Sequence, residues 1–123
     1  MRTFHFLTIA AALLPAAAQA QSAPPTGKAA FAPCMACHGT KPGETRMGPS
    51  MAGVVGRKAA TVSGYNYSQP MQKSGIVWTD AKLDAFMANP KAVVPGTKMF
   101  FQGVKSAGQR QAIVAYLKSL PAK

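Results

Sequence analysis

The sequence predicts a small all-α domain in which three main helices are joined by loops. Two segments, 79–88 and 106–120, place apolar residues at helical spacing behind residues that commonly cap helices. The segment 39–67 is rich in Gly and turn residues, which favours loops over regular structure. No strand–helix–strand pattern appears along the chain, so an α/β fold is not expected.

The first helix is expected to begin after Thr26, whose hydroxyl can accept a hydrogen bond from the first helical turn. It runs toward two cysteines, although Pro33 fits poorly inside a helix because proline lacks a backbone N–H. A short helical turn is expected after Ser68, and Gly75 ends it.

The two later helices have clear start and stop signals. One opens at Thr79 and ends before Pro90, because a proline disfavours helical geometry in the preceding residue; a methionine-containing loop follows it. The last begins with a capping box formed by Ser106 and Gln109, and Pro121 closes it. The residues expected to face the core are Leu83, Phe86, Met87, Ile113, Tyr116, Leu117 and Leu120.

The first twenty of the 123 residues have the features of a secretory signal peptide. Arg2 supplies a positive charge, an apolar stretch follows, and residues 18–20 have the small-x-small pattern of a cleavage site. The stretch is shorter than the roughly 20 apolar residues of a bilayer span, and Pro15 interrupts it, which disfavours an uncleaved anchor. Residues 21–123 are then expected to form one exported, periplasmic domain.

The chain is strongly basic, with 14 Lys and Arg against three acids and a formal net charge of +11. Losing Arg2 with the signal peptide leaves a charge of +10. The basic residues are mostly scattered singly, and no basic run alternates with stacking aromatics as in a nucleic-acid groove. Acidic protein surfaces are therefore the expected partners, and nucleic acid is not.

The only two cysteines lie in the segment Cys34-Met35-Ala36-Cys37-His38, which is the C-x-x-C-H signature of c-type haem attachment. Residues three and four apart share one face of a helical turn. Both thiols can then form thioethers with one haem while His38 approaches the iron from the same side. The pattern predicts one covalently attached haem c.

Other uses of two cysteines fit less well. A structural zinc site needs four ligands, and the mature chain offers only two Cys and His38. A thioredoxin-type dithiol needs a βαβ context, and a plain disulfide leaves His38 without a purpose.

The second axial ligand cannot be a histidine, because His38 is the last one left after signal cleavage. Met35 lies inside the attachment turn, and Met87 lies on a helical core stripe. Four methionines remain open on spacing alone, although one of them follows a Pro-Gly turn and precedes two aromatic residues: Met47, Met51, Met71 and Met99.

From about Gly27 to Leu120 the sequence closely resembles the class I cytochromes c, in particular mitochondrial cytochrome c and bacterial cytochrome c2. The resemblance implies a small all-α fold whose loops wrap one haem. The blocks that carry it occur in the family's order: residues 34–38, 48–49, 56–58, 75–78, 95–99 and 115–118.

The resemblance assigns roles around the haem. It implies that Met99 is the second iron ligand beside His38, and that the Pro49 carbonyl accepts a hydrogen bond from His38. The residues that match positions around the haem propionates are Arg57, Tyr67, Trp78 and Thr97. Phe101 matches an aromatic residue beside the exposed haem edge. Gly27 and Phe31 match a helix face that packs on the last helix near Tyr116.

Two departures from the mitochondrial pattern lie near the distal haem face. Phe86 stands where that pattern often has a tyrosine, and Met71 where it often has an asparagine. Both make the distal side less polar, so a perturbed reduction potential is expected. The lysines that match the surface near the haem edge are Lys91, Lys98 and Lys105. Ala92 and Ser106 replace further lysines, so this basic patch is expected to be thin.

These features predict a soluble, monomeric carrier that shuttles single electrons between acidic redox proteins of the reductase, oxidase or reaction-centre type. It is not expected to be an enzyme or to insert in a membrane after cleavage. The alternative is a small haem enzyme or sensor, of the peroxidase kind, in which the methionine ligand is labile.

Overall fold

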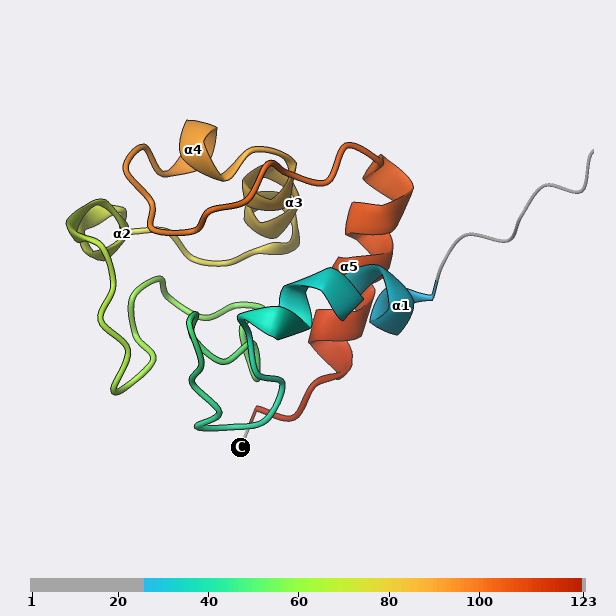
Figure 1. The fold of residues 1–123 in the computed structure, drawn as a ribbon, viewed down its shortest axis with the longest axis horizontal. Helices are drawn as coiled ribbons and strands as arrows, with labels where there is room; N and C mark the ends of the chain where they lie inside the picture. The colour runs from blue at the N-terminus through green and yellow to red at the C-terminus, as the bar shows by residue number, and fades with distance from the viewer. Residues whose placement is uncertain (1–25, 123) are drawn as a thin grey trace, which may run out of the picture.

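The computed structural model describes residues 26–122, and the predicted signal peptide at 1–20 lies outside them. Three main helical units and two short helices are joined by long loops, as the sequence predicts (Figure 1). Their order is α1 (Gly27–Phe31), the 3-10 helix η1 (Ala32–Ala36), α2 (Gln69–Lys73), α3 (Asp80–Ala88), α4 (Pro90–Val93) and α5 (Ala107–Ser119).

The first unit changes its helical type at Pro33. The Thr26 hydroxyl accepts a hydrogen bond from the N–H of Ala29 and caps α1. Pro33 lies in the first turn of η1, where a missing N–H is tolerated because that group has no helical partner. The change from α1 to η1 therefore resolves the misfit that the sequence shows at this proline.

Helix α1 crosses helix α5 at close range (Figure 1). A Cβ added to Gly27 would lie 2.3 Å from the Ala112 carbonyl oxygen and 2.7 Å from the Tyr116 Cβ. The rings of Phe31 and Tyr116 pack with their centroids 5.4 Å apart. Gly27 thus allows the two backbones to approach, and the predicted contact of Gly27 and Phe31 with the last helix is confirmed.

Helix α5 is also tied to α3 by two ion pairs. The Nε of Arg110 donates to Asp84 at 2.8 Å, and Lys118 pairs with Asp80. Arg110 also donates to the carbonyl oxygens of the residues before α5, at 2.8 Å and 3.0 Å. The start of α5 is therefore held against α3 by the partly buried guanidinium group of Arg110, which bonds one carboxylate and two carbonyl oxygens.

The segment between η1 and α2 has no helix and folds back on the chain after α2. The N–H of Trp78 donates to the Arg57 carbonyl at 2.9 Å, and the N–H of Ala59 donates to Ile76 at 2.7 Å. Lys58 and Val77 form an isolated antiparallel bridge within this pairing. These bonds bring two parts of the loop region, 56–59 and 76–78, side by side.

Two local expectations change in detail. The predicted end of α3 at Asn89-Pro90 is confirmed, but the short helix α4 comes before the methionine loop: the Asn89 side chain accepts from the N–H of Ala92, and Pro90 fits the first helical turn. At α5, the Ser106 hydroxyl accepts from the N–H of Gln109, and no reciprocal bond from the Gln109 side chain joins it among the described residues. The cap is therefore a single hydrogen bond rather than a capping box.

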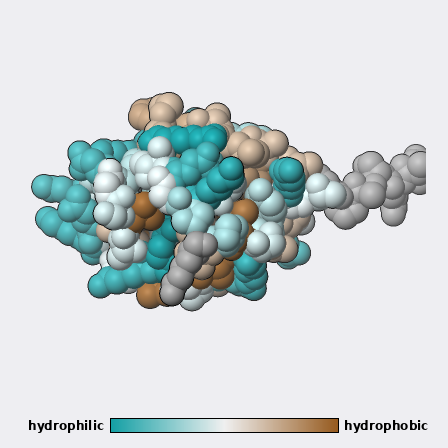
Figure 2. Space-filling view, turned by 90° about the horizontal axis from the view of Figure 1, so that it is seen from below, coloured by the Kyte–Doolittle hydropathy of each residue, from teal (hydrophilic) through white to brown (hydrophobic). Residues whose placement is uncertain are grey.

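The core is small and draws on each of the three main helical units. Its buried apolar residues are Phe31, Ala52, Val54, Ala59, Trp78, Leu83, Phe86, Met87, Val94, Ile113, Val114 and Leu117. Hydrophilic residues predominate on the face shown in Figure 2, where strongly hydrophobic ones occupy small separate areas. None of the helices in the described part of the chain has the length and apolar character needed to cross a bilayer.

The approach of α1 to α5 predicts the effect of Gly27→Ala. The added methyl group would overlap the Ala112 carbonyl, so we expect the free energy of unfolding to fall by about 1–3 kcal/mol. Urea unfolding of the haem-loaded protein measures this. Gly108→Ala is the matched control, because a Cβ there meets nothing closer than 3.8 Å and alanine favours the helix. Equal stability changes in the two variants would contradict the packing argument.

Candidate functional site

The two cysteines and His38 occupy a tight turn at the end of η1. The N–H groups of Cys37 and His38 both donate to the Cys34 carbonyl, at 3.1 Å and 2.9 Å. Both cysteines are half-buried free thiols. Burial raises the pKa of the Cys34 thiol, and the neighbouring Cys37 adds to the rise. The turn therefore gathers two thiols and an imidazole within five consecutive residues.

The imidazole of His38 is oriented by the loop that follows. Its Nδ1–H donates to the Pro49 carbonyl at 2.8 Å, since a carbonyl oxygen can only accept. The lone pair then lies on Nε2, the nitrogen left to bind a metal. Burial lowers the pKa of His38 and the charge of Arg57 lowers it further, while the Pro49 bond opposes them. Burial thus favours the neutral imidazole, the form that binds iron.

The same imidazole lies so close to residue 48 that only a glycine fits there. A Cβ at this position would lie 2.5 Å from His38 Cε1 and 2.8 Å from Nδ1. The N–H of Gly48 also donates to the Cys37 carbonyl at 2.8 Å. A glycine here therefore leaves space for the ring while its backbone holds the loop against the attachment turn.

A charged side-chain network closes this loop. One oxygen of Glu44 accepts from the N–H groups of Thr40 and Lys41, at 2.9 Å and 3.2 Å. Its other oxygen accepts from Arg46 at 2.7 Å, and Arg46 donates to the Met35 carbonyl at 2.6 Å. Neither Glu44 nor Arg46 carries a sequence motif, so only the folded structure shows their role.

Arg57 belongs to the paired segment 56–59, and its side chain reaches back to the loop after Pro49. Its guanidinium donates to the carbonyl oxygens of Ala52 and Ser50, at 2.9 Å and 3.0 Å. Burial lowers its pKa, and Tyr67 acts in the opposite direction. The two hydrogen bonds anchor the guanidinium to the backbone just after Pro49.

Trp78 is buried beside Arg57. Its side chain is 7% exposed, and its ring packs edge-on against Phe86 with the centroids 5.0 Å apart. The backbone of residue 78 is paired with residues 56 and 57. Trp78 therefore joins the loop that holds Arg57 to the apolar face of α3.

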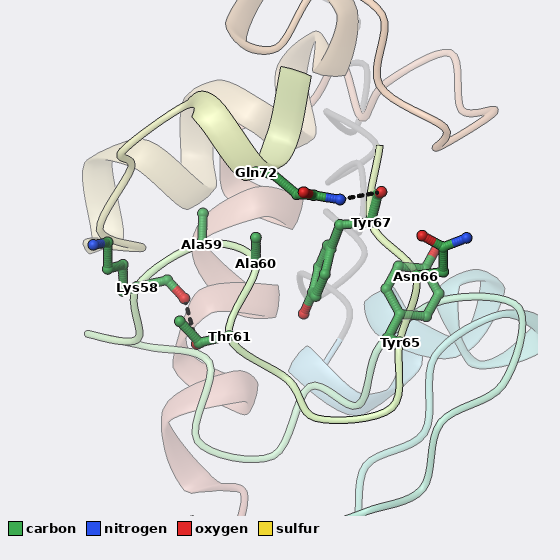
Figure 3. A pocket seen from close by; sticks show the side chains of 8 residues that line it. All are labelled: Lys58, Ala59, Ala60, Thr61, Tyr65, Asn66, Tyr67 and Gln72. Atoms are coloured by element: carbon green, nitrogen blue, oxygen red, sulfur yellow. Dashed lines mark hydrogen bonds between the residues drawn. The ribbon is translucent and has the colours of Figure 1, made fainter. Parts of the chain in front are cut away.

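Tyr67 lines an open hollow of about 390 Å³ formed by residues 58–61, 65–67 and Gln72 (Figure 3). Its hydroxyl accepts from the N–H of Val62 at 3.2 Å, and its carbonyl accepts from Gln72 at 2.9 Å. Tyr65 packs edge-on against it, with the ring centroids 4.7 Å apart. Burial raises the pKa of Tyr65, and Tyr67 and Cys37 add to the rise. Tyr65 carries no sequence motif, and only its contact with Tyr67 in the folded chain shows its role.

The loop with Met99 is a defined turn. Gly96 has a φ of +83°, and the N–H of Thr97 donates to the Val94 carbonyl at 3.0 Å. The Thr97 hydroxyl accepts from the N–H of Met99 at 3.3 Å. Met99 and Cys34 are both half-buried and pack against the same hydrophobic core. Phe101 is also half-buried, at the end of this turn.

The burial and position of the methionines reduce the candidates for the second iron ligand. Met47 is 80% exposed, whereas Met87 is 8% exposed within the core. Met51 comes two residues after Pro49, and its N–H donates to the Gly39 carbonyl, which places it on the side of His38. Met71 and Met99 are the half-buried candidates that remain on other segments.

The three predicted docking lysines are exposed. The Nζ of Lys98 donates to the Asn66 carbonyl at 2.6 Å and so ties the Met99 loop to the loop of Tyr67. The Nζ of Lys91, on α4, lies 5.8 Å from the centroid of the Phe100 ring. Lys105 immediately precedes the cap of α5.

Similarity to known proteins identifies the family to which this chain belongs. Residues 25–121 match the family model described as Cytochrome c. The chain belongs to the cytochrome c family. It is 48% identical over 91 residues to cytochrome c2 iso-2 of Magnetospirillum fulvum, covering 74% of this chain and 95% of that protein.

Two further relatives of this family member extend the comparison. Cytochrome c2 of Rhodomicrobium vannielii is 41% identical over 119 residues, which cover 95% of each chain. The solved structure of cytochrome cH from Methylobacterium extorquens matches with a TM-score of 0.72 and 45% identity, over 76% of this chain and 94% of that one. The class I cytochrome c fold predicted from the sequence is therefore confirmed.

Membership of the family also brings its cofactor, one covalently attached haem c. The residues present fit that group. Both thiols of Cys34 and Cys37 are free, the Nε2 of His38 is left to bind iron, and Gly48 leaves room for the imidazole. The predicted hydrogen bond between His38 and Pro49 is present.

The position of Glu44 predicts a pH-dependent contribution to stability. The hydrogen bond from Arg46, followed by those from Thr40 and Lys41, holds its pKa below the ordinary 4.5. A lowered carboxyl pKa stabilises the folded state above pH 4.5, and the contribution disappears as the pH falls through the lower folded value. Glu44→Gln is therefore expected to lower the urea midpoint of the haem-loaded protein at pH 7 but not in strong acid. A difference that persists unchanged into strong acid would contradict this.

Proposed function

We propose that this protein is a soluble periplasmic carrier that shuttles single electrons through a c-type haem with His38 and Met99 as axial ligands. The hydrogen bond from His38, in the attachment turn, to the Pro49 carbonyl of the following loop is the observation that carries the proposal. It fixes the ring and its tautomer, as partner groups of metal-binding histidines do. The names of the relatives, cytochrome c2 and cytochrome cH, support the same function.

Cys34 and Cys37 hold the cofactor as thioethers, and the turn between them keeps His38 at the iron. Bound haem c supplies a one-electron change between ferrous and ferric iron, and His/Met ligation raises its reduction potential. Because His38 is fixed by the covalent turn and by Pro49, it stays in place during that change. A site that does not rearrange keeps the cost of electron transfer low.

Met99 is proposed as the second ligand. It lies on a turn fixed by Gly96 and the Thr97 hydroxyl, and Lys98 ties this turn to Asn66. Three independent constraints therefore hold the loop on which the sulfur is carried. Met71, the other half-buried candidate, lies on the short helix α2 and matches a non-ligand position in the resemblance.

Arg57, Tyr67, Trp78 and Thr97 are proposed to receive the haem propionates. A carboxylate that leaves water needs hydrogen-bond donors or an opposite charge. Arg57 supplies the charge, since its guanidinium is held on the carbonyls of Ser50 and Ala52, and the other three supply N–H or O–H donors. Phe101 is proposed to lie at the exposed edge of the haem.

The distal side is proposed to be apolar. Phe86 is 8% exposed and packs against Trp78, and Met71 packs against the same core. Neither side chain offers an O–H donor to the methionine sulfur. This arrangement is expected to perturb the reduction potential relative to relatives with a tyrosine and an asparagine at these positions.

The proposed partners are acidic redox proteins of the reductase, oxidase or reaction-centre type. The formal net charge of +10 without residues 1–20 and the exposed lysines 91, 98 and 105 favour encounter with negatively charged faces. The carrier is proposed to work in the periplasm as a monomer after removal of residues 1–20.

Met99→Ala tests the ligand assignment. We expect the variant to lose the weak band at the red end of the oxidised visible spectrum and to bind carbon monoxide in the reduced state, because the iron loses a ligand. Met71→Leu is the matched control and should keep the band. Loss of the band in Met71→Leu alone would assign the ligand to Met71. Rapid carbon monoxide binding by the unaltered protein would favour a peroxidase-like enzyme instead.

The docking lysines predict a salt-dependent reaction with the partner. Oxidation of the reduced protein by washed membranes of the source cells should slow between about 0.01 M and about 0.1 M salt, as the screening length falls from about 30 Å to about 10 Å. Replacing Lys91 and Lys105 by Gln should flatten this dependence. A rate that is indifferent to salt in the unaltered protein would contradict electrostatic docking.

A further inference from the structure

Glu44 and Arg46 form an ion pair on the loop that follows the attachment turn, with 2.7 Å between the paired atoms. Their side chains are 32% and 42% exposed, and an ion pair this exposed adds little to stability by itself. Both side chains, however, also bond to backbone groups. The backbone groups that they hold, rather than the attraction between the two charges, therefore give the pair its importance.

The backbone groups held by the pair lie on both sides of His38. The Nη1 of Arg46 donates to the Met35 carbonyl at 2.6 Å, three residues before the histidine. The Oε2 of Glu44 accepts from the N–H of Thr40 at 2.9 Å, two residues after it. Arg46 uses its other terminal nitrogen, Nη2, for the ion pair, as its forked guanidinium allows. Glu44 and Arg46 together, hereafter the loop clamp, thus span the metal-binding histidine.

The residue directly after His38 is packed against Glu44. A Cβ added to Gly39 would lie 2.2 Å from the Glu44 carbonyl oxygen and 2.5 Å from its Cγ. The Gly39 carbonyl accepts from the N–H of Met51 at 2.9 Å. Gly39 therefore lies between the loop clamp and the segment after Pro49, so a displacement of Glu44 would be passed to both.

The other side of the clamp is joined to the turn that carries Pro49. The N–H of Arg46 donates to the Gly48 carbonyl at 3.0 Å, and the N–H of Gly48 donates to the Cys37 carbonyl at 2.8 Å. Gly48 immediately precedes Pro49, whose carbonyl accepts from His38. The loop clamp therefore acts on both partners of the hydrogen bond between His38 and Pro49.

We propose that Glu44 and Arg46 are positioning residues that hold the hydrogen bond between His38 and Pro49 and thereby lower the reduction potential of the haem-loaded protein. An acceptor on the outer N–H of an imidazole makes the ring a stronger donor to its metal. A stronger donor favours ferric over ferrous iron, so a firmly held bond lowers the potential. The proposal rests on the proposed function, because it takes His38 as an iron ligand.

A direct electrostatic effect of the two charges is the competing explanation, and it differs in sign. Removal of the negative charge of Glu44 would raise the potential, whereas removal of the positive charge of Arg46 would lower it. Loss of the clamp should raise the potential in both cases, because either loss loosens the bond between His38 and Pro49. Arg46 is therefore the position that separates the two explanations.

The test compares the reduction potentials of the haem-loaded protein and three variants. Glu44→Gln, Arg46→Gln and Arg46→Lys should each have a raised potential. Lysine keeps the charge, but its compact ammonium lacks the fork that reaches Met35 and Glu44 together. Asp80→Asn combined with Lys118→Gln is the matched control, because it removes an exposed ion pair between α3 and α5 and should leave the potential unchanged.

Hydrogen exchange in the reduced protein supplies a readout that does not involve the iron. The N–H groups of Gly48 and Met51 bond to carbonyls of the attachment turn and of the residue after it. In the clamp variants they should exchange roughly tenfold faster, the factor that corresponds to loss of one hydrogen bond to a charged group. The control variant should keep the exchange rates of the unaltered protein.

Two results would overturn the positioning role and leave the proposed function intact. An unchanged potential in Arg46→Lys, together with a lowered one in Arg46→Gln, would assign the effect to charge alone. Unchanged potentials and exchange rates in all three variants would show that the C-x-x-C-H turn holds His38 unaided. A third result, the absence of a one-electron couple in the unaltered protein, would remove the proposed function together with the clamp.

Discussion

The hydrogen bond from His38 to the carbonyl of Pro49 is the contact on which the rest of the site depends. It joins the attachment turn to the loop that follows, and it decides which imidazole nitrogen is free for a metal. Gly48 leaves the space that the ring occupies. Glu44 and Arg46 then close the loop by bonding backbone groups on both sides of it. Backbone and side-chain contacts of the following loop therefore position the imidazole, in addition to the C-x-x-C-H turn itself.

The helices serve mainly to hold long loops in place. The approach of α1 to α5 at Gly27 and the ion pairs between α3 and α5 form a frame. Against this frame lie the paired segments 56–59 and 76–78 and the Met99 loop. A chain of this size has a thin core of its own, because a shorter chain buries a smaller fraction of its surface on folding. A covalently held haem is well suited to such a frame, since it supplies apolar volume that the short helices do not.

The acidic and basic residues of the surface have different roles, and this difference suits an electron carrier. Each acidic residue among 26–122 is used in an internal ion pair, and these pairs hold loops and helices. The lysines near the Met99 loop have no carboxylate partner there, so their charge acts outward. Lys98 and Lys91 also have structural contacts, with Asn66 and Phe100. The same cations can therefore shape the loop and attract a partner.

The helices, their caps and the haem attachment site were predictable from sequence because their causes are local. A capping residue bonds within one turn, and C-x-x-C-H acts within five residues. Helix α4 was missed because a proline after α3 signals both an end and a possible new start. Tyr65, Glu44 and Arg46 stayed hidden because their roles arise from contacts that spacing does not encode. Residue types and spacing determined the fold class and the chemistry of the cofactor, whereas only the tertiary structure decided which loops meet, because those contacts join residues far apart in the chain.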